Sequence, residues 1–160
     1  MFTFDRSLIS VGSISQLEPG QFFIAGDTNG SFVGLRIKDV QGNPAWLILT
    51  GENAFQFDMA QRGSKAAFKI SIPTGGIKLR VDQASIASNS DHRVGQLVVD
   101  AANSAGIAAL WPDLADKNYR NIVRIDTWAQ SNRDGDALLF DRWALSYVDE
   151  AGQWVDIVRR

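Results

Sequence analysis

Short runs of alternating apolar and polar residues, separated by frequent turn signals, are the feature that most constrains the fold of this chain. Turn signals recur about every ten to fifteen residues, a spacing typical of all-β proteins. Examples are Glu18-Pro19-Gly20, Asn29-Gly30, and Gln41-Gly42-Asn43-Pro44. No long segment shows the 3.6-residue period of an amphipathic helix. The sequence therefore predicts an all-β fold, an antiparallel, meander-like sandwich or barrel of roughly ten to twelve short strands with a minor helix.

The most regular alternation falls on either side of the turn at Pro73-Thr74-Gly75-Gly76. Ala66–Ile72 and Ile77–Val81 place apolar residues at every second position, so we expect them to pair as a half-buried hairpin. The basic residues Lys78 and Arg80 then fall on its solvent side.

A second region leaves two structures open. Gln96–Asp100 and Ile107–Trp111 predict two strands joined by a small, polar connection. A helix over Ala101–Leu110 is the alternative, because alanine favours helix, although Asn103, Ser104 and Gly106 oppose it.

Composition limits the class of protein. The 160 residues are enough for one domain, residues 1–160, with a hydrophobic fraction of 45%. Acidic and basic residues are interspersed and the formal net charge is −2, so we expect no nucleic-acid partner. The absence of cysteine excludes disulfides and thiolate metal sites. No stretch reaches the roughly 18 apolar residues of a membrane span and no signal peptide is visible, so we expect a cytoplasmic protein without a membrane partner.

The last forty residues predict three antiparallel strands with two unlike faces. A turn at Asp134-Gly135 pairs Asn121–Gln130 with Ala137–Val148, and a turn at Asp149–Gly152 adds Gln153–Arg159. Side chains alternate across a strand, so this register sets Val148 opposite Gln153 and sorts the residues by face. One predicted face holds Val123, Ile125, Phe140, Ala144, Val155 and Ile157. The other holds Arg124, Asp126, Trp128, Asp141, Trp143, Tyr147, Trp154 and Asp156. Arg142 is an exception on the first face, as are Leu139 and Leu145 on the second.

The aromatic and charged face has three interpretations. The first is a second hydrophobic core, because large aromatic rings most often serve burial. The other two interpretations place the face on the surface. An exposed surface of Trp, Tyr and Arg is typical of a protein interface, which here predicts a homodimer. Flat rings beside carboxylates also fit a saccharide platform. The candidate ligand or interface residues are Arg124, Asp126, Trp128, Asp141, Trp143, Tyr147 and Trp154.

Motifs for catalysis, cofactors and metals are weak. Asp126 and Asp141, as predicted neighbours across two strands, could act as acid and base on a glycosidic bond. Asn132–Asp136 is similar to part of a calcium loop but lacks its first aspartate and final glutamate, and we interpret it as a hairpin turn. The lone histidine, His92, lies in a polar segment and is expected to have no chemical role. We therefore assign no catalytic residue, metal site or cofactor.

The expected function is a non-catalytic binding or assembly module that self-associates through a sheet edge or through the aromatic and charged face. A carbohydrate-binding domain with a tryptophan platform is the alternative, and a carbohydrate-active hydrolase is less favoured.

Overall fold

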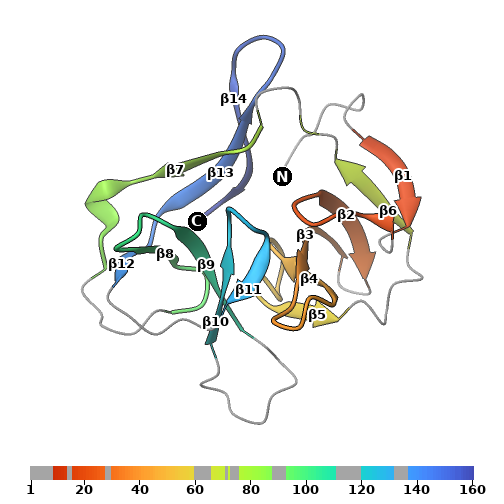
Figure 1. Cartoon of the computed structure of the whole chain (residues 1–160). Coiled ribbons are helices and arrows are strands. Elements are labelled where there is room, and N and C mark those ends of the chain that lie inside the picture. Colours follow the sequence, from red (N-terminus) through yellow and green to blue (C-terminus); the bar gives the residue numbers. More distant parts are fainter. Residues whose placement is uncertain are drawn as a thin grey trace.

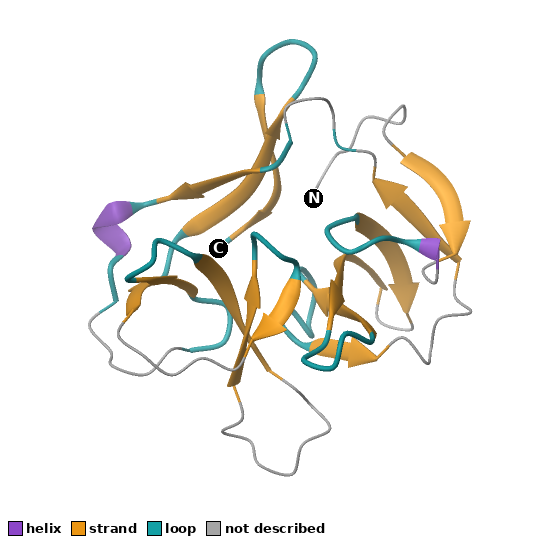
Figure 2. Cartoon of the chain, viewed as in Figure 1, coloured by secondary structure: helices purple, strands orange, loops and turns teal. Residues whose placement is uncertain are grey.

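The described part of the chain is built from two β-sheets (Figures 1 and 2). In this computed structural model, the described residues are 9–13, 16–27, 30–59, 66–70, 72, 76–87, 93–110, 120–131 and 137–160. They form fourteen strands and a short 3-10 turn, η4 (Gln83–Ser85), so the predicted all-β class is confirmed.

The strands are β1 (Ile9–Ser13), β2 (Phe22–Asp27), β3 (Gly30–Lys38), β4 (Pro44–Ile48), β5 (Phe57–Met59), β6 (Ala66–Ile70), β7 (Lys78–Val81), β8 (Leu97–Asp100), β9 (Ala105–Leu110), β10 (Arg120–Arg124), β11 (Ala129–Ser131), β12 (Ala137–Phe140), β13 (Trp143–Val148) and β14 (Trp154–Arg159).

The larger sheet has 11 strands in the order β1-β6-β2-β3-β11-β10-β9-β8-β12, with β4 paired to β3 and β5 paired to β4. Its pairings are antiparallel except that between β11 and β3, which is parallel. The second sheet, called the small sheet below, contains β14, β13 and β7 in that order. Figure 1 shows the loop between β13 and β14 projecting at the top of the view.

The main hydrophobic core takes side chains from both sheets. Phe22, Leu35 and Leu47 contribute from the larger sheet, and Leu145 and Ile157 from the small sheet; all are fully or almost fully buried. Each lies on one face of its strand, as the two-residue period of β structure requires. This shared core fixes the position of the small sheet against the larger one.

The connection between β8 and β9 is a hairpin, not a helix. Leu97 pairs with Ile107 and Val99 with Ala105, with a tight turn between them. Asn103 in this turn has a φ of 61°, a left-handed conformation that asparagine tolerates better than most residues. The strand alternative of the sequence analysis is therefore confirmed and the helix over Ala101–Leu110 is wrong.

The predicted hairpin around residues 73–76 is wrong. β6 pairs with β1 and β2 in the larger sheet, whereas β7 pairs with β13 in the small sheet. The alternation of apolar residues correctly predicts that both segments are strands. It does not determine which strand each of them pairs with. The basic residues of β7 consequently lie beside residues more than sixty positions later in the chain.

The predicted pairing of residues 121–130 with 137–148 is also wrong. β10 turns back on itself at residues 125–128 and pairs with β11, so Ile122 lies opposite Ser131. Trp128 closes this turn with a φ of 51°. β12 pairs instead with β8, and β13 with β7 and β14. The expected turn at Asp134-Gly135 lies outside the described residues.

The hairpin between β13 and β14 has a shorter loop than predicted. Val148 pairs with Trp154, because Asp149 and Gln153 are joined by a backbone hydrogen bond of 2.9 Å around Glu150-Ala151-Gly152. Gly152 has a φ of 77°, as in three-residue hairpin loops that end in a glycine bulge. The Asp149 carboxylate also accepts a hydrogen bond from the Gln153 amide at 2.7 Å. This one-residue slip reverses the predicted faces of β14 relative to β13.

Within the described residues, we find no helix with the length and apolar character needed to cross a membrane.

Candidate functional site

The small sheet has an apolar inner face and a charged outer face. On the inner face, Trp143, Leu145 and Tyr147 of β13 are buried in the main core. Leu79 and Val81 of β7 and Val155 of β14 pack against the same core. The intervening residues of each strand form the outer face: Lys78, Arg80, Ala144, Ser146, Val148, Trp154, Asp156 and Arg159.

A β-bulge in β14 decides which residues reach the outer face. Leu145 pairs with Val158 and Ser146 with Asp156, so Ile157 is an extra residue in β14. Ile157 and Val158 are consequently both buried. A bulge of this kind offsets the alternation by one residue. Arg159 therefore returns to the same face as Asp156.

A depression with a volume of about 370 Å³ lies at one end of the outer face. We call it the arginine-lined depression; it is lined by Arg80, Val81, Asp82, Arg142, Trp143, Ala144, Arg159 and Arg160. Ala144 pairs with Arg80 on one side and with Arg159 on the other. The small side chain in the central strand, between two long ones, leaves the hollow. Its volume falls within the roughly 300–1,000 Å³ of small-molecule sites.

Carboxylates hold the three outer guanidinium groups in place. Asp156 lies 3.2 Å from Arg80 and 2.5 Å from Arg159, measured from carboxylate oxygen to guanidinium nitrogen. Asp82 lies 2.9 Å from Arg142. Each guanidinium has five N–H donors. One carboxylate contact leaves donors on each group that can bind a ligand, and it reduces the entropy that is lost on binding.

Arg80 is further oriented by an aromatic ring. Its guanidinium carbon lies 5.5 Å from the centroid of the Trp154 ring, a cation–π arrangement. Ser146, which pairs with Lys78 on one side and Asp156 on the other, is fully buried. The Trp154 side chain itself remains half exposed, at 50%.

Arg160 has a different role at the inner end of the depression. Its guanidinium donates to the Val94 carbonyl at 2.6 Å and lies 5.8 Å from the Phe55 ring centroid. The Trp143 indole N–H donates to the next carbonyl, that of Gly95, at 2.9 Å. These contacts attach the loop before β8 to the small sheet. They engage two residues, Trp143 and Arg160, that also line the depression.

Asp156 stays ionised to a lower pH than an ordinary aspartate. Partial burial acts to raise its pKa, but the Ser146 hydroxyl, which donates at 2.6 Å, and the guanidinium groups of Arg159 and Arg80 outweigh that effect. The net result is a lowered pKa. The outer face therefore keeps its alternating charges at neutral pH.

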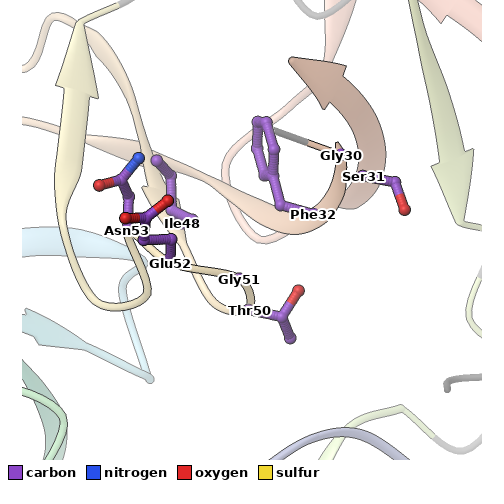
Figure 3. Close-up of a pocket in the computed structure, with 8 residues that line it drawn as sticks. All are labelled: Gly30, Ser31, Phe32, Ile48, Thr50, Gly51, Glu52 and Asn53. Carbon is purple, nitrogen blue, oxygen red and sulfur yellow. The ribbon is translucent and has the colours of Figure 1, made fainter. Parts of the chain in front are cut away.

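A second, smaller cleft lies on the larger sheet (Figure 3). Its volume is about 50 Å³, room for little more than ordered water. Phe32 lies on one side and Ile48, Glu52 and Asn53 on the other. The Thr50 hydroxyl accepts a hydrogen bond from the Val33 amide, so it supports the backbone. This cleft is too small for a ligand of sugar size.

The structure does not bring the seven sequence candidates onto one face. Trp143 and Tyr147 are each 2% exposed and point into the core. Trp154 lies on the opposite, outer face of the same sheet. Trp128 packs edge-on against Phe22 at a centroid distance of 6.1 Å. The three tryptophans thus form no common platform.

The charged candidates are divided in the same way. Arg124 and Asp126 form an ion pair of 2.7 Å at the turn after β10. Asp141, between β12 and β13, accepts from Gln96 at 2.8 Å and from Arg93 at 3.1 Å. The Arg124 hydrogen bond lowers the pKa of Asp126, and the Gln96 hydrogen bond lowers that of Asp141. A general acid for a glycosidic bond needs a raised pKa, which neither carboxyl group has. The ligand or interface role of the seven residues stays a prediction.

Sequence reasoning missed most of the arginine-lined depression. The alternation of apolar residues predicts that Arg80 is a solvent-facing residue of a local hairpin, and no sequence motif marks Arg159. The one available clue was Arg142, an arginine that did not fit the aliphatic face predicted for it.

Two other sequence features lie outside the described residues. They are the calcium-like segment Asn132–Asp136 and the lone histidine, His92. Among the residues that are described, no group of three or more Asp, Glu or His side chains is placed to hold a metal ion.

No protein-family model, curated protein or solved structure matches this chain. The class of protein is accordingly defined by the fold and the site: an all-β protein with an arginine-lined depression on the outer face of its small sheet.

Proposed function

We propose that this protein is a binding domain that recognises an anionic ligand in the arginine-lined depression. The observation that carries the proposal is that Arg80, Arg142 and Arg159 line one hollow of about 370 Å³ together with Ala144. Guanidinium groups bind oxyanions through charge-assisted hydrogen bonds, which are stronger than neutral ones. A site already oriented by Asp82 and Asp156 loses little side-chain freedom on binding.

The charge of the site supports an anion specifically. Four arginines line the depression, and two carboxylates, Asp82 and Asp156, form ion pairs with three of them. The fourth, Arg160, lies beside the Arg93–Asp141 ion pair, which adds no net charge. The local excess is positive although the whole chain has a formal net charge of −2. Such a concentration of one sign of charge raises the local concentration of the opposite ion.

Isothermal titration calorimetry with inorganic phosphate, sulfate and citrate tests this function. We expect at least one of these anions to bind the wild-type protein. We expect R159Q to weaken binding about tenfold, the loss of one charge-assisted hydrogen bond. R124Q is the matched control, since Arg124 is also ion-paired but does not line the depression. Absence of binding for all three anions, or an equal loss in R124Q, would reject the proposal.

Self-association is a second candidate, favoured by one observation. Val148 and Trp154 face each other across the end of the β13–β14 hairpin and are 37% and 50% exposed. Sedimentation velocity of wild type and W154S over a wide concentration range tests it. A dimer that W154S dissociates would support assembly through this hairpin, and a wild-type monomer at all concentrations would exclude it.

A further inference from the structure

The number and arrangement of the guanidinium groups also indicate which anion fits. Arg80 comes from β7, Arg159 from β14, and Arg142 from the residue that precedes β13. All three line the same hollow as Ala144: the first two belong to residues that pair with Ala144 in neighbouring strands, and the third lies two residues before it in the chain. A carboxylate offers only two oxygens to such a set. A phosphate ester offers three acceptor oxygens, as many as there are outer guanidinium groups.

The charge excess points in the same direction. Four guanidinium groups line the depression against the two carboxylates Asp82 and Asp156, and the Arg93–Asp141 ion pair beside Arg160 adds no net charge, so an excess of two positive charges remains. A phosphate monoester carries a charge of about −1.5 to −2 at pH 7 because its second pKa is near 6. A sulfate monoester or a carboxylate carries a single negative charge. The phosphate monoester therefore balances the site most closely.

The volume indicates that the phosphate is attached to a larger body. About 370 Å³ is far more than a bare oxyanion fills. A sugar or nucleoside ring would complete the filling of the hollow.

We infer that the ligand of the arginine-lined depression is a small phosphate monoester carried on a ring, with its phosphoryl group between Arg80, Arg142 and Arg159. This inference rests on the proposed function and specifies its ligand. The phosphorylated ring can belong to a sugar or to a nucleoside, which share the recognised chemistry.

A matched ligand series tests the inference. Glucose 6-phosphate, glucose 6-sulfate, glucuronate and glucose present similar rings with different charged groups. We expect glucose 6-phosphate to bind about tenfold more tightly than the sulfate or the carboxylate at pH 7.5. Its affinity should fall about tenfold at pH 5.0, where the monoester is mostly singly charged. The sulfate ester keeps its charge, so its affinity reports any titration of the protein itself and serves as the control. AMP in place of glucose 6-phosphate separates a nucleoside source from a sugar source.

Three outcomes distinguish the failure of this inference from the failure of the proposed function. Equal affinities for phosphate, sulfate and carboxylate, with no difference in pH dependence between the two esters, would overturn the phosphate inference and leave anion binding intact. Binding of glucose as tight as that of glucose 6-phosphate would also overturn it. No binding of any anion, including inorganic phosphate, would remove the proposed function as well. R142Q should reduce the preference for phosphate over sulfate, whereas R124Q should leave it unchanged.

Discussion

Asp156 and Arg159 form an ion pair of 2.5 Å on the outer face of the small sheet, although they lie three residues apart on the same strand. Residues three apart on a regular strand point to opposite faces. The extra residue Ile157 removes that separation, because the bulge buries Ile157 and Val158 together. The same bulge brings a third arginine to the depression. Asp156 is thereby both a support for Arg80 and Arg159 and a competitor for the anion that they would bind.

Substitution D156N should separate these two effects. Removing the carboxylate charge frees donors on Arg80 and Arg159, so we expect anion affinity to rise about threefold to tenfold at low salt. The free energy of unfolding should fall at the same time, because Ser146 and two arginines lose a charged partner. Calorimetry and urea unfolding on one preparation measure both. D126N, which removes an ion-paired carboxylate at the turn after β10, should leave anion affinity unchanged.

Filling the floor of the depression should weaken anion binding without unfolding the protein. Ala144 is 5% exposed and lies between Arg80 and Arg159, so the longer side chain of A144L would occupy the space assigned to the ligand. We expect at least about a tenfold loss of anion affinity with an unchanged circular dichroism spectrum. A144S, which is close to alanine in size, is the control and should bind normally. Normal binding by A144L would place the ligand elsewhere.

The two tryptophans of the small sheet should differ in their contribution to stability. W143F removes the indole N–H that donates to the buried Gly95, and the carbonyl left without it costs about 1–3 kcal/mol. W154F removes only part of an exposed cation–π contact and should cost less than about 1 kcal/mol. Urea unfolding monitored by circular dichroism measures both. Equal losses, or a larger loss for W154F, would contradict the assignment of Trp143 to the core and Trp154 to the surface.

Acid should weaken the fold through Asp156. Its pKa is lowered in the folded protein, so in the pH range between the folded value and the unfolded value of about 3.9 the unfolded chain binds more protons. The stabilisation is complete above the unfolded pKa and is lost as the pH falls through the folded pKa. The free energy of unfolding of the wild type should therefore drop below about pH 4, and D156N should show a shallower drop. Parallel pH profiles for the two proteins would show that Asp156 contributes nothing to acid stability.

The alternation of apolar and polar residues predicted where the strands lie. It could not predict which strands pair when they are far apart in the sequence. The hairpin of β8 and β9 was accessible because its strands are joined by a short turn. β7 and β13 are also regular strands, but Arg80 and Ala144 become neighbours only through a pairing across more than sixty residues. No alternation of apolar residues encodes that partner choice.

The faces of β14 were mispredicted for a smaller reason. A three-residue loop ending at Gly152, in place of the assumed four-residue loop, moved Trp154 opposite Val148. The extra residue Ile157 shifts the alternation by one position again, so the predicted and observed faces agree only beyond Ile157. Because side-chain direction has a period of two, each one-residue change reversed the face of every residue that follows.

The most direct test of the central claim is a titration of the isotopically labelled protein with inorganic phosphate, followed residue by residue by NMR. The account predicts that the largest shifts occur at the backbone amides of Ala144 and Arg159 and at the guanidinium groups of Arg80 and Arg142, with little change around Phe32 and Glu52 in the smaller cleft. Shifts confined to another surface, or no shifts at millimolar phosphate, would contradict the assignment of the arginine-lined depression as an anion site.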